Sequence, residues 1–120
     1  MREQLVTSVL RELIASSEDI EGSALISMDG LLLVSLLPAE FVQERVAAMS
    51  AAMLALGSQA TAELRRGELD QILIKSQGGY VLLTRASPDT VLVVITGPEA
   101  KLGTTFIDVR RGAQALARAI

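Results

Sequence analysis

The chain has no cysteine, histidine or tryptophan, and its only aromatic residues are Phe41, Tyr80 and Phe106. Without cysteine there is no disulfide, no thiolate chemistry and no cysteine-ligated zinc or iron–sulfur site. Without histidine the chain lacks the commonest general base and metal ligand. So few aromatic residues cannot form a stacking platform for single-stranded nucleic acid, and a formal net charge of -3 disfavours binding to phosphates. These absences favour a binding module over an enzyme, and predict no cofactor, no metal and no nucleic-acid partner.

Apolar segments are present, but none is long enough to span a bilayer. The most apolar stretches are Leu31–Leu37 and Val46–Gly57, far short of the roughly 20 residues that a membrane-spanning helix needs. The first residues, MREQLVTSVLRELI, mix charged with apolar side chains and do not resemble a signal peptide. For 120 residues without a linker or an internal repeat, we expect a single domain over residues 1–120, cytoplasmic and not inserted in a membrane.

Three segments have the apolar spacing of helices. Residues 3–16 carry apolar side chains at intervals of three and four, which is one helical face. A long alanine-rich helix is expected from Ala39 to about Arg65, with Pro38 at its start and Gly67 as its C-terminal cap. The same spacing predicts a last helix from Leu102 to Ile120.

Five short apolar segments have the composition of strands. Asp29-Gly30 separates the first two, and Gly78-Gly79 separates the next two. Each dipeptide indicates a tight hairpin, the first with a type I′ turn, which requires positive φ at both central residues. The fifth is rich in β-branched residues. The expected strands are Ser23–Met28, Leu31–Leu36, Gln71–Ser76, Tyr80–Arg85 and Thr90–Thr96.

The predicted order of elements is αββαβββα, which specifies the fold class. Strands joined by tight turns are antiparallel, and the only long connection is the central helix. We therefore expect a three-layer α/β sandwich, in which the central helix covers one face of a five-stranded antiparallel sheet and the terminal helices cover the other.

The central helix has two kinds of apolar stripe. Bulky residues recur at alternating intervals of four and three, and we expect them to pack on the sheet. A second set of small residues is free to pack closely on another surface. The bulky set is Val42, Val46, Met49, Met53, Leu56 and Ala60, and the alanine stripe is Ala48, Ala51, Ala52, Ala55 and Ala62, interleaved with Ser58 and Gln59.

The strand that follows this helix points to self-association. If Gln71–Lys75 lies at the sheet edge, it forms one self-complementary surface with the alanine stripe. Pairing across a two-fold axis would join two sheets and bury two antiparallel helices side by side. A monomer whose edge is protected by Gln71 and Lys75 is the alternative. The predicted dimer interface comprises Ala48, Ala51, Ala52, Ala55, Ser58, Gln71, Leu73 and Lys75.

Other chemistry finds little support in the sequence. Ser87 could act as a nucleophile only with a lysine, Lys75 or Lys101, because no histidine is available. The carboxylates at residues 18–21 and 68–70 lack the spacing of a calcium loop, so we interpret them as solvated turn residues. A small-molecule sensor is a further alternative, and it predicts a sizeable apolar cavity between helix and sheet.

Two arginine pairs, Arg65-Arg66 and Arg110-Arg111, are expected in the second halves of helices. Cations are favourable there because of the helix macrodipole. Contact of Arg65 and Arg66 with an acidic or phosphate-bearing partner is the functional alternative.

The chain resembles the Roadblock/dynein light chain family over nearly its whole length. The resemblance rests on four segments in the same order: residues 22–30 (GSALISMDG) in the first hairpin, 46–49 (VAAM) in the central helix, 67–69 (GEL) before the third strand, and 100–103 (AKLG) leading to 109–111 (VRR).

This resemblance implies a module that homodimerises through its central helix and third strand. Prokaryotic members of the family are partners of small Ras-like GTPases, and some stimulate GTP hydrolysis, whereas eukaryotic relatives are adaptors. The GTPase-facing surface surrounds the paired central helices. Carried over by position, the implied partner-binding residues are Gln43, Arg45, Ser50, Gln59 and Glu63. The function expected is regulation or scaffolding of a small Ras-like GTPase.

Overall fold

The computed structural model describes residues 2–120. Their order of helices and strands is the one expected from the sequence. The elements are α1 (Glu3–Ala15), β1 (Ile20–Ser27), β2 (Leu32–Ser35), α2 (Gln43–Glu63), β3 (Gln71–Ser76), β4 (Gly79–Ser87), β5 (Thr90–Thr96) and α3 (Leu102–Ala119).

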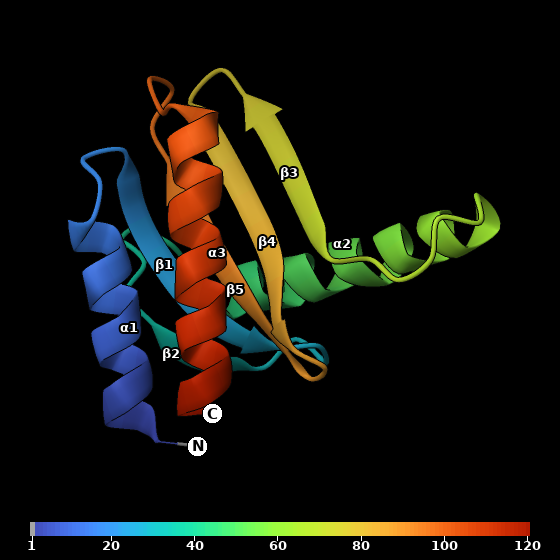
Figure 1. The fold of residues 1–120 in the computed structure, drawn as a ribbon, viewed down its shortest axis with the longest axis horizontal. Coiled ribbons are helices and arrows are strands. Elements are labelled where there is room, and N and C mark those ends of the chain that lie inside the picture. The colour runs from blue at the N-terminus through green and yellow to red at the C-terminus, as the bar shows by residue number, and fades with distance from the viewer. Residues whose placement is uncertain (1) are drawn as a thin grey trace.

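The strands of residues 2–120 form a five-stranded sheet in the order β2-β1-β5-β4-β3 (Figure 1). Every neighbouring pair is antiparallel. At the centre, β1 pairs with β5, so that Ala24 lies opposite Val93 although the two are far apart in sequence. β3 is an edge strand, as the self-association hypothesis requires.

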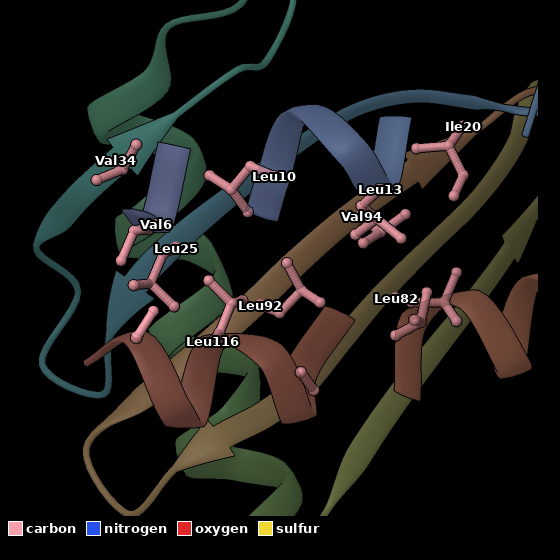
Figure 2. Packing of buried hydrophobic residues seen from close by; sticks show 13 residues of the cluster. Val6, Leu10, Leu13, Ile20, Leu25, Val34, Leu82, Leu92, Val94 and Leu116 are labelled. Carbon is pink, nitrogen blue, oxygen red and sulfur yellow. The ribbon is translucent and has the colours of Figure 1, made fainter. Parts of the chain in front are cut away.

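The helices cover the two faces of the sheet as expected. Figure 1 shows α1 and α3 side by side on one face, and α2 crossing behind the strands on the other. Figure 2 shows Leu10 and Leu13 of α1 and Leu116 of α3 in one apolar cluster with Leu92 and Val94 of the sheet. A second apolar cluster joins the opposite face to α2 through Ala47 and other buried residues: Ile26, Leu54, Leu83, Val91 and Val93. The three-layer sandwich is confirmed.

α1 and α3 pack closely because Gly112 stands where they meet. A Cβ at position 112 would lie 3.2 Å from Cδ2 of Leu13, which leaves no room for a larger residue without displacing that side chain. The two helices run in opposite directions (Figure 1).

The first hairpin is confirmed, but its turn is not the expected type I′. The Gly30 N–H donates to the Ser27 carbonyl at 3.0 Å, and the Ser27 N–H donates to the Leu31 carbonyl at 2.9 Å. Within the turn only Gly30 has positive φ, at 92°. This is a loop of three residues, Met28–Gly30, in which a single left-handed glycine returns the chain to the strand direction.

The second hairpin is shifted by one residue from its expected position. Ser76 pairs with Gly79, so Gln77 and Gly78 form the turn and Gly79 opens β4. Gly79 has φ 139°, whereas Gly78 has no positive φ. A Cβ on Gly79 would collide with the carbonyl oxygen of Thr96. Glycine is therefore required at position 79 by two independent constraints.

α2 is shorter at both ends than expected from the sequence. The Phe41 N–H donates to the Pro38 carbonyl at 3.1 Å, so a turn follows Pro38 and the helix begins only at Gln43. Its last residue is Glu63, which leaves Arg65 and Arg66 outside the helix. Within residues 2–120, no helix has the length and apolar character needed to cross a membrane.

Candidate functional site: the outer face of α2 and the β3 edge

The inner face of α2 is formed by small and medium residues. Ala47, Ser50 and Leu54 are buried on this face, at intervals of three and four residues. Ala47 and Leu54 belong to the apolar cluster beneath the helix. The short Ala47 and Ser50 side chains allow the helix backbone to approach the sheet, and Leu54 fills the space beyond them.

The bulky residues expected to pack on the sheet instead face outward in large part. Val42, Met49 and Leu56 are 55 %, 52 % and 68 % exposed. Their seven-residue spacing, two helical turns, places them in one row, which we call the outer stripe. Val46 and Met53 flank this row and are half-buried against the sheet. The expectation that the whole bulky set packs on the sheet is wrong, because the inner face is rotated away from the outer stripe.

The residues of the alanine stripe differ in exposure. Ala48, Ala52 and Ala55 are exposed. Ala51 is half-buried, because the first hairpin loop lies against it: a Cβ on Gly30 would be 3.4 Å from the Ala51 Cβ. The outer face of α2 therefore combines the outer stripe with the exposed alanines.

α2 extends past its own sheet. Gly57 is the point at which it crosses the edge strand, since a Cβ there would lie 3.0 Å from Cδ2 of Leu69 and 3.2 Å from Cδ1 of Ile72. Figure 1 shows the last turns of α2 projecting beyond β3. In this overhang, residues 58–63, four of the six residues are exposed, and none is buried. This segment gains little stability from its own chain.

The overhang ends in a Schellman motif without the expected glycine. The Arg65 N–H donates to the Ala62 carbonyl at 3.0 Å, and the Arg66 N–H donates to the Thr61 carbonyl at 2.7 Å. Arg65 takes the left-handed conformation, with φ 57°. The capping role assigned to Gly67 belongs to Arg65, and Gly67 lies two residues further on. Arg65 and Arg66 therefore do not lie in the second half of α2 as expected, but directly after its C-terminus, where the macrodipole still favours cations.

The β3 edge contributes mainly its backbone to the outer surface. Ile72 packs in the cluster beneath α2. Because side chains alternate along a strand, Gln71, Leu73 and Lys75 point to the opposite face. Gln71 Nε2 donates to Thr84 Oγ1 at 2.8 Å, whereas Leu73 is 40 % exposed. The three predicted side chains thus do not continue the alanine stripe, and the feature shared with α2 is the unpaired strand edge.

The structure separates the residues that the resemblance implied for partner binding. Arg45, Gln59 and Glu63 are exposed on the outer face of α2, and Gln43 is half-buried at its start. Ser50 is only 2 % exposed. Its expected exposure is wrong, because it lies on the inner face.

The serine nucleophile hypothesis fails on topology. Ser87 Oγ lies 2.6 Å from Thr90 Oγ1 at one end of β4. Lys75 pairs with Tyr80 at the other end, seven residues or about 23 Å away along the strand. Lys101 follows β5 at that same far end, where the Tyr80 N–H donates to Thr96. Neither lysine is placed to activate Ser87.

A surface groove of about 800 Å³ lies between α3 and the β3–β4 edge. Phe106 and Ala113 supply apolar wall, but Asp70, Gln71 and Arg110 also line it. This mixed groove is unlike the apolar cavity that the sensor hypothesis predicts.

The sequence of this chain was compared with models of known protein families. The model of the Roadblock/LC7 domain matches residues 7–96, a range that contains α2 and the whole sheet. The chain belongs to the Roadblock/LC7 domain family. This is a family of regulatory and interaction domains.

Individual Roadblock-like relatives extend the match to α3. An uncharacterized protein of Methanocaldococcus jannaschii is 34% identical over 92% of this chain and 95% of its own length. The solved structure of the gliding protein MglB from Thermus thermophilus is similar with a TM-score of 0.88 at 19% identity, over 98% of this chain and 89% of that one. An MglB structure with a tetrameric arrangement has a TM-score of 0.90 at 20% identity, over 98% and 88%. The fold is therefore that of a Roadblock/LC7 domain along nearly its whole described length.

The features of this Roadblock/LC7 domain that sequence reasoning missed are the outer stripe and the overhang. Of the large apolar residues that are exposed in residues 2–120, most lie on or next to α2 and β3: Phe41, Val42, Met49, Leu56, Leu64 and Leu73. The available signal was Gly57, since a glycine within a long helix often marks a close approach to another element.

Proposed function

We propose that this chain is a homodimeric interaction module that regulates or scaffolds a small Ras-like GTPase. The observation that carries the proposal is the outer stripe on α2, next to a helix segment that overhangs an unpaired strand edge. Exposed apolar side chains gathered in one region are typical of protein–protein contact. An overhanging helix and an open edge are both incomplete in the single chain, and a second copy completes both.

The dimer would pair β3 with β3 of the partner subunit across a two-fold axis. The two sheets then form one continuous sheet, and the overhang of each α2 extends over the partner's half. Met49 and Leu56 become buried between the two helices, where each large apolar side chain contributes about 1.5–3 kcal/mol when fully removed from water. The exposed alanines let the helix backbones approach.

The GTPase assignment is supported by family membership and by the likeness to MglB, since prokaryotic Roadblock proteins are partners of small Ras-like GTPases. Arg45, Gln59 and Glu63 supply charged and polar groups beside the outer stripe. Such groups at the rim of an interface set specificity and association rate more than affinity. Stimulation of hydrolysis is one form that this regulation could take.

Light scattering coupled to gel filtration tests the dimer. The wild-type chain is expected to elute with twice the mass of one chain at micromolar concentration, and Leu56→Glu as a monomer. Ile107→Glu is the matched control, because Ile107 is similarly exposed but lies on α3, on the opposite face of the sheet. A monomeric wild-type chain, or a dimer that survives Leu56→Glu, would contradict the proposal.

Titration calorimetry with a small Ras-like GTPase from the same organism tests the second half of the proposal. Binding is expected to differ between the GDP-loaded GTPase and the form loaded with a non-hydrolysable GTP analogue. Gln59→Ala combined with Glu63→Ala should weaken it, while light scattering still reports a dimer. A GTPase that binds neither wild type nor variant in either nucleotide state would disprove the assignment.

A further inference from the structure

A buried carboxylate on α3 lacks a complete set of partners. The side chain of Asp108 is only 9 % exposed, and its Oδ1 lies 3.5 Å from Nη1 of Arg111. Oδ2 is shielded from solvent and accepts no hydrogen bond from any residue described in the structure. Arg111 itself extends outward, with 66 % of its side chain exposed. The single ion pair therefore serves one carboxylate oxygen and leaves the other without a donor.

Such an arrangement is unfavourable unless another group completes it. A buried polar atom without a hydrogen bond costs about 1–3 kcal/mol, and more when it carries charge. Buried carboxylates in proteins are accordingly paired or hydrogen-bonded, and an exception calls for a specific explanation. Asp108 plays no part in the outer face of α2, because α3 lies on the other side of the sheet (Figure 1).

Asp108 lines a cleft between α1 and α3. The cleft has a volume of about 250 Å³, several times the roughly 30 Å³ that one water occupies in the liquid. Its charged groups are two carboxylates, of Asp108 and Glu12, and one guanidinium, of Arg111. The remaining lining is mostly apolar or small: Val9, Leu13, Ser16, Gly112 and Ala115.

This lining selects a particular kind of cation. The excess of carboxylates favours a positive group over a neutral or negative one. The apolar walls disfavour a compact, strongly hydrated ammonium and suit a flat guanidinium, which is more weakly hydrated. A guanidinium also matches a carboxylate with two parallel N–H donors.

We propose that the cleft between α1 and α3 binds the guanidinium group of an arginine side chain presented by another protein, with Asp108 as its carboxylate partner. As the ligand enters, the guanidinium of Arg111 leaves Oδ1, and the Asp108 carboxylate rotates about its Cβ–Cγ bond so that both oxygens face the cleft. Glu12 adds a second negative group at the rim. Asp108 lies outside residues 7–96, to which the Roadblock/LC7 model matches. The site and the proposed dimer interface are on opposite faces of the sheet, so each stands without the other.

Nuclear magnetic resonance titration of the full chain with N-acetyl-arginine amide tests the site directly. Saturable amide shifts are expected at Leu13, Asp108 and Gly112. The neutral isostere N-acetyl-citrulline amide, N-acetyl-lysine amide and potassium chloride at equal ionic strength are expected to leave these amides unshifted. Equal shifts with any of these three, or no localised shift with the arginine probe, would overturn the proposal.

Three variants make the test specific. Asp108→Asn keeps the shape and removes the charge, and should weaken arginine binding at least about tenfold. Ala115→Leu adds bulk to the lining of the cleft, two helical turns along α3 from Asp108, and should abolish binding. Asp89→Asn, an exposed carboxylate at the β4–β5 turn, is the control and should bind as wild type.

Two readings of these variants contradict the proposal. If Asp108→Asn is folded and binds as wild type, the carboxylate is not the partner. If Asp108→Asn loses its native spectrum, the test rests on Ala115→Leu. Unchanged arginine binding by Ala115→Leu would show that the probe binds outside the cleft, which contradicts the proposal. Light scattering on each variant should show an unchanged oligomeric state. The outcome of the dimer proposal is thus measured independently of arginine binding.

Discussion

Gly57 of α2 lies against Ile72 of β3, so close that a Cβ at position 57 would be 3.2 Å from Ile72 Cδ1. This contact sets the height at which the helix passes over the edge of the sheet. It also marks where α2 stops being supported by its own chain, since the residues after it overhang. The same glycine thus controls both the packing of one chain and the surface offered to a second.

Gly57→Val is expected to lower the free energy of unfolding by about 1–3 kcal/mol, because an over-packed contact pushes α2 off the edge. Urea denaturation monitored by circular dichroism measures the change. Ala60→Val, one turn further on and exposed, is the control: it places the same side chain in α2 without a tight contact and should cost well under 1 kcal/mol. Equal losses in the two variants would show that the Gly57 contact is unimportant. Gly57→Ala should stay within about 1 kcal/mol of wild type, because better propensity offsets the tight contact.

Leu54 and Leu56 are two residues apart and face in opposite directions. Truncation of Leu54 should therefore lower the stability of the fold, and truncation of Leu56 should weaken self-association. Leu54→Ala removes a side chain that is 3 % exposed and should cost about 2–4 kcal/mol of folding free energy. Leu56→Ala should cost the fold less than about 1 kcal/mol but weaken self-association. Denaturation of dilute protein and analytical ultracentrifugation separate the two effects. A Leu56→Ala chain that is as destabilised as Leu54→Ala would contradict the orientation of α2.

Arg65→Gly is expected to stabilise the chain by about 0.5–1 kcal/mol. A non-glycine residue in the left-handed region costs about 1–2 kcal/mol, and glycine avoids this cost while losing more entropy on folding. Arg66→Gly is the matched control, because Arg66 has no positive φ and should be neutral or destabilising. Thermal denaturation at one protein concentration compares the Tm of each variant with that of wild type. A gain at Arg66 equal to that at Arg65 would point to removal of positive charge instead of relief of backbone strain.

Gly79→Ala should destabilise the chain by more than about 3 kcal/mol, because the new Cβ meets both a steric block at Thr96 and an unfavourable φ. Gly78→Ala, at the neighbouring position, should change stability by less than about 1 kcal/mol, because no atom lies within 4 Å of its added Cβ. Amide hydrogen exchange of β3 and β4 would localise the damage. Similar behaviour of the two variants would show that the turn tolerates movement by one residue.

The sequence predicted the layers of this fold because each depends on local chemistry. Apolar periodicity located the helices, and glycine-containing turns located the hairpins. The bounds of α2 were harder, because its cap uses Arg65, a residue whose intrinsic preference is against the left-handed conformation. The first hairpin has a three-residue loop in place of the expected two-residue type I′ turn, because Gly30 alone supplies a positive φ. The second is shifted by one residue, because the positive φ belongs to Gly79 and not to Gly78.

The site was only partly predictable. The edge position of β3 was a condition of the self-association hypothesis, and the structure meets it. The rotation of α2 about its axis was not predicted. Val42, Met49 and Leu56 have the spacing of a core-facing row, and periodicity alone does not say which side of a doubly apolar helix meets the sheet. That choice is made by Gly30 and Ile72, which contact α2 from segments distant in sequence.

The pairing of β1 with β5 has a consequence for how the chain is made. The centre of the sheet joins strands at opposite ends of the sequence, and Ile20 finds its partner only when Thr96 is available. Non-local pairing of this kind slows folding, because a long loop must close before contacts form. During synthesis at about 5–20 residues per second, the apolar strands of the first hairpin remain without their central neighbour for several seconds. Nascent chains of this protein should therefore depend on chaperones until β5 leaves the ribosome.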